Sequence, residues 1–294
     1  MLGAEYVNNK KIKKISSFRE EIRIAIGDIC VGVNISDGVI RNELQEKYRD
    51  FLSRKRVNIQ VYCRNIAVLE PQFDEILYET NLYKVGKIGG NFVLFFLHLS
   101  SLLKFNKKLN QVVYYSQDQS GHYLINLLFL TLFSLVLPNN NAILLHASGV
   151  LNKNKGHLFA APSGGGKSTI SKLAIKKGYT LLNDDRVFLY KDKINKQLKI
   201  CGTPWHGEIP LFTNKSGKID KIFFLVKSKY NKIQPMNKGV ALTQLYRNSC
   251  SFMAISDILK NKNNFYQVLL KEMDFYWLYF KPGQDLWRLI DEAR

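Results

Sequence analysis

One short stretch, Ala161–Ser168 with the sequence APSGGGKS, limits what this chain can fold into more than any other. Its three consecutive glycines, Gly164–Gly166, let backbone N–H groups approach an anion closely, and Lys167 adds a positive charge directly after them. The preceding residues His157–Ala161 are typical of a buried strand, and Lys167–Lys177 places apolar residues at helical spacing. A strand, a glycine turn and a helix in this order predict a loop that binds phosphate groups at a helix N-terminus.

The loop assigns a role to each of its residues. We expect Lys167 to reach the β- and γ-phosphates of a bound triphosphate and Ser168 to offer its hydroxyl to Mg²⁺. Ala161 stands where the usual pattern has glycine, but that position only turns the chain. The residues expected to bind the nucleotide are Ser163, Gly164, Gly165, Gly166, Lys167, Ser168 and Thr169.

Two adjacent carboxylates, Asp184 and Asp185, follow the strand-like segment Tyr179–Leu182. If that strand lies beside the one that leads into the glycine loop, both side chains face the phosphates. Phosphoryl transfer requires positioned charge, a metal ion and a group that orients or deprotonates the acceptor hydroxyl. Two acids can divide those tasks, one at Mg²⁺ and one as base. The alternative interpretation is that the two aspartates form only a polar turn at the strand end and take no part in catalysis.

The segment Leu144–Val187 resembles the catalytic domain of the HPr kinase/phosphorylase family and, more distantly, ATP-dependent phosphoenolpyruvate carboxykinase. The matching landmarks, in order, are His146, Gly149-Val150, Ser163–Ser168, Gly178-Tyr179 and Asp184–Val187. The resemblance implies an α/β fold whose phosphoenolpyruvate-carboxykinase-like P-loop domain, residues 139–294, contains a mixed sheet. We expect residues 1–138 to form an N-terminal α+β domain that contacts the substrate or a partner.

The resemblance also implies a kinase that uses ATP and Mg²⁺ to phosphorylate a serine hydroxyl. The implied catalytic residues are Asp184 as base, Lys167, and His146 near the acceptor or the γ-phosphate; Asp185 is implied as the metal partner. The family's arginine- and glycine-rich segment linked to phosphorolysis is not recognisable, so we do not expect phosphorylase activity. The first half does not resemble the N-terminal domain of the bifunctional enzyme, so HPr is not an expected substrate.

The segment Gly202–Glu208, GTPWHGE, is similar to one in stand-alone kinase-like proteins of ribosomal peptide biosynthetic clusters, including those for lasso peptides. Glu208 is therefore a candidate second acid and metal residue, and His206 a further candidate. We expect Trp205 to pack in the core. Arg186 and Arg247 can neutralise transition-state charge. The expected substrate is a serine of a peptide or protein, with ribosomal natural-product precursors among the candidates.

Two other functions stay open. A small-molecule kinase, acting for example on free serine, needs the same site with a different acceptor pocket. A regulator that senses ATP and binds nucleic acid would use the formal charge of +19. The lysines, however, are scattered among asparagine and isoleucine, and sensing needs no base, so we do not expect nucleic acid as a partner. A homo-oligomer stays open.

The four cysteines, Cys30, Cys63, Cys201 and Cys250, form no CxxC pair and indicate neither a zinc site nor a disulfide framework. The first residues lack the apolar core of a secretory signal. The longest apolar run, Leu124–Leu137, is shorter than a bilayer span. We therefore expect a cytoplasmic protein that does not enter a membrane.

Periodicity predicts the remaining elements. In the first half we expect a hairpin over 20–35 that turns at Gly27-Asp28, helices over 42–52 and 121–137, and strands over 57–63, 77–79, 82–85, 92–99 and 111–116. In the second half we expect strands over 142–146, 148–151, 157–161, 179–182, 187–190, 198–201, 221–226 and 275–280, helices over 167–177, 241–248 and 265–272, a helix after Pro282-Gly283, and irregular structure over 202–208.

Overall fold

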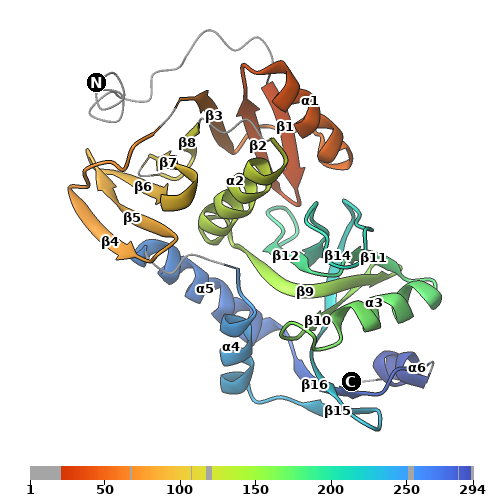
Figure 1. Ribbon diagram of the computed structural model, residues 1–294. Helices are drawn as coiled ribbons and strands as arrows, with labels where there is room; N and C mark the ends of the chain where they lie inside the picture. Colours follow the sequence, from red (N-terminus) through yellow and green to blue (C-terminus); the bar gives the residue numbers. More distant parts are fainter. Residues whose placement is uncertain are drawn as a thin grey trace. The chain divides into compact units, whose positions relative to one another are not determined.

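The computed structural model describes residues 21–66, 68–106, 108–116, 121–250, 255–283 and 285–292 (Figure 1). The chain forms two compact units. The first is built mainly from residues 29–136, and the second mainly from residues 137–251 and 257–294. Each unit contains one mixed β-sheet and its own helices, so the fold is mixed α/β.

The sheet of the first unit has eight strands in the order β1-β2-β3-β8-β7-β6-β5-β4. β3 pairs in parallel with β2 and with β8, while the strands from β8 to β4 pair antiparallel. The predicted hairpin is confirmed, with Gly27 at its turn in the left-handed region (φ +57°). The strand bounds are β1 Glu21–Ile26, β2 Ile29–Asn34, β3 Ile59–Asn65, β4 Glu75–Glu79, β5 Tyr83–Ile88, β6 Asn91–Phe96, β7 Ser101–Phe105 and β8 Gln111–Ser116.

Two helices, α1 (Gly38–Lys47) and α2 (Gly121–Val136), complete this unit, with short 3-10 turns at Arg49–Phe51 and Leu97–Leu99. α1 begins earlier than the predicted 42–52 because the Asp37 side chain caps it, accepting from the N–H groups of Val39 and Ile40. α1 packs on α2, where the rings of Tyr48 and Phe129 lie 5.0 Å apart.

Sequence reasoning missed β7. The predicted strand over 92–99 ends at Phe96, and the chain then turns through Ser100 in the left-handed region (φ 42°) before β7 begins. A serine in this conformation gives no glycine or proline signal, so the turn was not visible in the sequence.

The sheet of the second unit follows the order β10-β9-β12-β13-β14-β16-β15, with β11 paired to β9. β10 also pairs in parallel with β14, so β9, β12, β13, β14 and β10 form a closed ring of pairings. The strand bounds are β9 Ala142–Asn152, β10 Lys155–Ala160, β11 Thr180–Asn183, β12 Arg186–Lys191, β13 Leu198–Cys201, β14 Ser216–Lys227, β15 Lys232–Pro235 and β16 Phe275–Phe280.

Helices cover both faces of this sheet. α3 (Lys167–Lys176) and α6 (Asp285–Glu292) pack on one face of the sheet, against side chains of β10. α4 (Lys238–Arg247) and α5 (Ser256–Glu272) pack on the opposite face. Trp287 of α6 meets Phe159 of β10 edge to face at 6.1 Å between ring centroids. These two apolar layers fix the end of β10, and with it the start of the glycine loop.

In this unit two predicted strands are one, one strand was missed, and the condition stated for the paired aspartates is not met. The segments 142–146 and 148–151 are one continuous strand, β9, because different partners pair along its length: β12 with the first half, β10 and β11 with the second. β15 was missed because it is a four-residue edge strand. β11 does not lie beside β10; β9 separates them. A 3-10 turn at Pro138–Asn140 precedes β9.

No helix in the described part of the chain combines the length and the apolar character that a membrane crossing requires.

Candidate phosphate-binding site

The glycine loop has the backbone geometry that an anion cradle requires. Gly164 (φ +72°) and Gly166 (φ +104°) lie in the left-handed region, and Gly165 donates its N–H to Pro162 O at 3.0 Å. A Cβ added at Gly166 would lie 2.5 Å from the ring of Phe280, so only glycine fits there. α3 begins directly after Gly166, so the N–H groups of its first turn face the loop.

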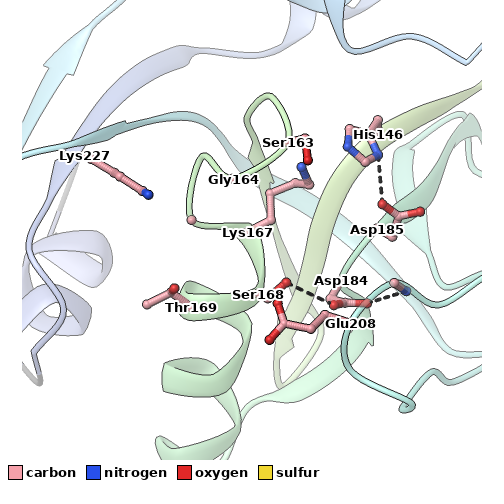
Figure 2. Close-up of a pocket in the computed structure, with 12 residues that line it drawn as sticks. His146, Ser163, Gly164, Lys167, Ser168, Thr169, Asp184, Asp185, Glu208 and Lys227 are labelled. Atoms are coloured by element: carbon pink, nitrogen blue, oxygen red, sulfur yellow. Dashed lines mark hydrogen bonds and ion pairs between the residues drawn. The ribbon is translucent and has the colours of Figure 1, made fainter.

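A cavity of about 380 Å³ opens over this loop, which is the size range of ligand pockets. Figure 2 shows the side chains that line it. They come from β9, the loop, the start of α3, the turn after β11, the 202–209 segment and the end of β14. The lining residues are His146, Ser163, Gly164, Gly166, Lys167, Ser168, Thr169, Asp184, Asp185, Gly207, Glu208 and Lys227.

Gly165 is the one predicted nucleotide-binding residue outside this lining. A Cβ there would lie 2.5 Å from the Cβ of Ala161, so Gly165 serves the tight turn of the loop. The other residues predicted to bind nucleotide or metal, and the predicted catalytic residues Asp184, His146 and Lys167, border the same cavity. The further candidates His206, Arg186 and Arg247 do not line it.

Lys167 lies beneath the loop with only 7% of its surface exposed. Its ammonium group donates to Ala161 O at 2.9 Å and to Pro162 O at 3.2 Å. An ammonium has three N–H donors, so with two used on described residues the third can reach a phosphate oxygen. Burial lowers the pKa of Lys167, and the nearby carboxylates of Asp185 and Asp184 oppose that effect.

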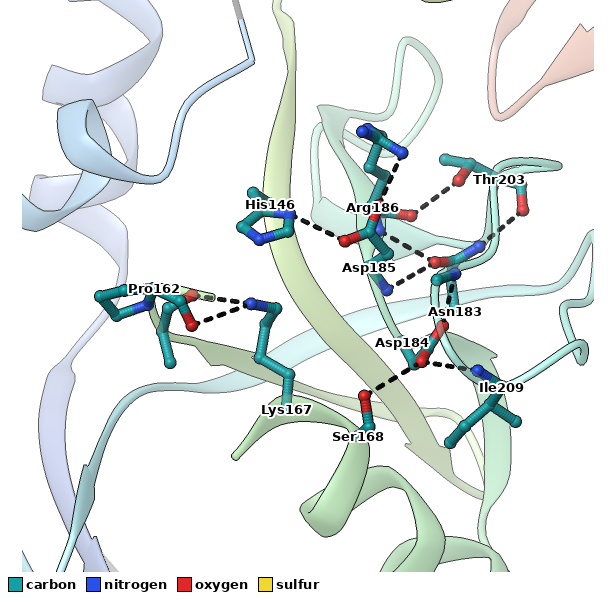
Figure 3. A network of polar contacts seen from close by, with 12 residues as sticks. His146, Pro162, Lys167, Ser168, Asn183, Asp184, Asp185, Arg186, Thr203 and Ile209 are labelled. Carbon is teal, nitrogen blue, oxygen red and sulfur yellow. Dashed lines mark hydrogen bonds and ion pairs between the residues drawn. The ribbon is translucent and has the colours of Figure 1, made fainter. Parts of the chain in front are cut away.

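Asp184 is buried, with 2% of its surface exposed, and is held by three donors. Its Oδ1 accepts the N–H of Gly207 at 2.8 Å, and its Oδ2 accepts the N–H of Ile209 at 3.0 Å and the hydroxyl of Ser168 at 3.4 Å (Figure 3). The carboxylate is therefore fixed beside the hydroxyl at the start of α3.

Asp185 points the other way, toward β9 (Figure 3). Its Oδ1 lies 3.0 Å from His146 Nδ1, and its Oδ2 lies 2.6 Å from Arg186 Nη1. Burial raises the pKa of Asp185, but the hydrogen bond from His146 and the charge of Arg186 outweigh it, so the pKa falls below 3.8. Asp185 is a carboxylate at neutral pH and holds the His146 ring in one orientation.

The 202–209 segment is irregular, as predicted, and brings Glu208 to the cavity. The exposed Glu208 carboxylate accepts from Lys172 Nζ at 2.6 Å. That hydrogen bond and a second one from Ser168 lower the pKa of Glu208. Trp205 is buried as predicted, whereas His206 stacks on Phe212 and does not line the cavity.

Sequence reasoning missed two residues of the cavity wall, Gly207 and Lys227. Gly207 packs so closely on the paired aspartates that a Cβ there would lie 2.8 Å from the Cβ of Asp185. Lys227 ends β14, which runs parallel to β10, so both strands deliver their carboxyl ends to the same edge. Figure 2 shows Lys227 across the loop from His146. The position of Lys227 directly after the apolar segment 221–226 was a sequence signal that could have identified it as a residue of the cavity wall.

Within the described residues, no group of three or more His, Cys, Asp or Glu side chains lies close enough to hold a metal ion alone. Mg²⁺ commonly takes one or two protein oxygens and completes its shell with phosphate oxygens and water. The Ser168 hydroxyl and the Asp184 carboxylate, 3.4 Å apart at the edge of the phosphate cradle, are hard oxygen donors of that kind.

No protein-family model and no curated protein matches this sequence. Among solved structures, the chain is similar to the HPr(Ser) kinase/phosphatase from Coxiella burnetii. The two share 16% sequence identity over 50% of this chain and 86% of that chain, with a TM-score of 0.32. The function of this site is therefore argued from its own geometry.

Proposed function

We propose that this protein is a kinase that uses ATP and Mg²⁺ to phosphorylate a serine hydroxyl of a peptide or protein. The observation that carries the proposal is the division of two adjacent carboxylates at one edge of a phosphate cradle. Asp184 lies against Ser168, and Asp185 lies against His146. Binding of a triphosphate needs only the loop, whereas transfer needs both a metal position and a group that handles the acceptor proton.

The metal position in this proposal is formed by Ser168 and Asp184. Bound there, Mg²⁺ would neutralise charge on the β- and γ-phosphates. Asp184 suits this task because two backbone N–H groups hold it rigidly. Glu208, which shares a hydrogen bond with Ser168, would assist from the cavity wall.

The proton of the acceptor hydroxyl goes to the Asp185–His146 pair. Asp185 binds Nδ1 of His146, which leaves Nε2 as the ring atom that takes the proton. This assignment exchanges the roles that the family resemblance implies, in which Asp184 is the base and Asp185 the metal partner.

The acceptor class follows from the resemblance of Leu144–Val187, with natural-product precursor peptides among the candidates. Access to the site is consistent with a macromolecular acceptor, because the side chains of His146 and Asp185 keep 33% and 18% of their surface exposed.

The test is incubation with ATP labelled at the γ-phosphate, Mg²⁺, the peptides encoded near the gene, and free serine, followed by mass spectrometry. Transfer to a peptide serine supports the proposal, and transfer to free serine alone would make the protein a small-molecule kinase. Lys167→Ala should abolish transfer. Lys176, an exposed lysine of the same helix, provides the matched control variant Lys176→Ala. Absence of any Lys167-dependent transfer would refute the proposal.

A further inference from the structure

Asn183 lies directly before the two carboxylates, at the end of β11, and is fully buried. Its Oδ1 accepts two backbone N–H groups, from Asp185 at 2.8 Å and from Arg186 at 2.9 Å. Asparagine side chains stabilise tight turns by bonding the backbone a few residues ahead. Here that bond shapes the turn on which Asp184 and Asp185 stand (Figure 3).

The other end of the same amide fastens the turn to the 202–209 segment. Asn183 Nδ2 donates to Thr203 O at 2.9 Å, and the Thr203 hydroxyl donates back to Arg186 O at 2.7 Å. Thr203 is also fully buried. Asn183 and Thr203 therefore hold the turn from both sides through fully buried side chains, and we call this pair the clamp.

The clamp decides where each carboxylate points. Neighbouring Cα atoms are only about 3.8 Å apart, yet Asp184 reaches Ser168 while Asp185 reaches His146. The backbone N–H of Asp185 is held by Asn183, and the backbone N–H groups of Gly207 and Ile209 hold Asp184. Gly207 and Ile209 belong to the 202–209 segment, which Thr203 joins to the turn. One network of hydrogen bonds therefore sets the directions of the Asp184 and Asp185 side chains.

We infer that Asn183 is a positioning residue for phosphoryl transfer, which together with Thr203 separates the metal-side carboxylate from the carboxylate that orients His146. This inference rests on the proposed function and extends it to a residue that does not line the cavity. Asn183 lies outside the loop and outside the Asp-Asp pair, and nothing in the sequence pattern singled it out.

The test compares Asn183→Ala with the wild-type protein by two measurements. In steady-state kinetics we expect kcat to fall about 30- to 100-fold, as displacements near 1 Å do, while KM for ATP changes less than about threefold because the loop is untouched. In a crystal structure of Asn183→Ala, the Asp185 carboxylate should lie beyond hydrogen-bond distance of His146 Nδ1, from which its Oδ1 is 3.0 Å away in the wild-type protein.

Further variants distinguish a loss of carboxylate orientation from a general loss of folding. Asn183→Ser keeps an oxygen acceptor and should fall between wild type and Asn183→Ala. Thr203→Ser keeps the hydroxyl and should retain kcat, whereas Thr203→Val should lose it. Asn34→Ala removes a buried amide of the first unit, which donates to Val61 O at 3.3 Å, and should leave kcat and the contact between Asp185 and His146 unchanged.

Each outcome decides the inference. An unchanged kcat, or an unchanged contact between Asp185 and His146 in Asn183→Ala, would overturn it. If the wild-type protein transfers no phosphate, the proposed function fails, and the position of the Asp185 carboxylate in the variant decides whether Asn183 orients it. If Asn183→Ala does not fold, Thr203→Val and Asn183→Ser carry the same two readouts.

Discussion

Replacing Asp184 with asparagine tests the division of roles between the two carboxylates most directly. The buried Asp184 carboxylate accepts from the N–H groups of Gly207 and Ile209 and from the Ser168 hydroxyl. Asparagine keeps one acceptor oxygen and places an NH₂ group where the second oxygen was. One backbone N–H then faces another donor, at a side chain position that is 2% exposed.

Asp184→Asn should lower both the thermal stability of the protein and the rate of phosphate transfer, and the size of each effect follows from this geometry. An unsatisfied buried donor costs about 1–3 kcal/mol. For a unit of this size each kcal/mol lowers Tm by roughly 2–4 °C, so we expect a fall of about 2–12 °C. Loss of the charge at the metal position should cost about 3 kcal/mol of transition-state stabilisation, or roughly 100-fold in transfer rate.

The assay is phosphate transfer over a Mg²⁺ titration, with thermal unfolding measured on the same samples. Asp184→Asn should need more Mg²⁺ and lose most of its rate. Asp185→Asn should keep the wild-type Mg²⁺ dependence and lose rate through the misoriented His146 ring. If instead Asp185→Asn shifts the Mg²⁺ dependence and Asp184→Asn does not, our assignment is wrong and the roles implied by the family resemblance hold.

Three further predictions concern the loop and its surroundings. Lys167→Ala should weaken ATP binding at least tenfold in calorimetry, because its ammonium is the cation buried directly beneath the loop; equal affinity to wild type would contradict this. Gly166→Ala should lower both Tm and nucleotide affinity, since the Cβ would meet Phe280 at 2.5 Å in a left-handed backbone; a fully stable, ATP-binding variant would show that the loop is placed differently. The folded-state pKa of Asp185 is below 3.8, so its carboxylate stabilises the fold above that pH and the contribution is lost as the pH falls further. Urea unfolding from pH 5 to pH 2 should therefore show a shallower pH dependence for Asp185→Asn than for wild type, and identical curves would argue against the His146 and Arg186 contacts.

Much of the second unit could be predicted from the sequence because its elements carry strong local signals. The strands β13 and β16 match their predicted bounds, and α3 ends at Lys176, shortly before Gly178, whose backbone is left-handed (φ +87°). The misses lie where local signals are weak. Ser100 turns the chain without glycine, and β15 is a short edge strand with mostly polar residues.

The sequence by itself determined the glycine loop and the helix that follows it, because a run of three glycines followed by lysine, serine and apolar residues at helical spacing allows few other structures. Only the tertiary structure decided what surrounds it. The direction of each aspartate depends on Asn183, on Thr203 and on N–H groups of the 202–209 segment, about twenty residues along the chain. Lys227 reaches the cavity because β14 pairs with β10 across a still longer separation. Backbone hydrogen bonds and strand pairing between distant residues leave no local periodicity, so a sequence pattern identifies the loop but not the partners that orient its chemistry.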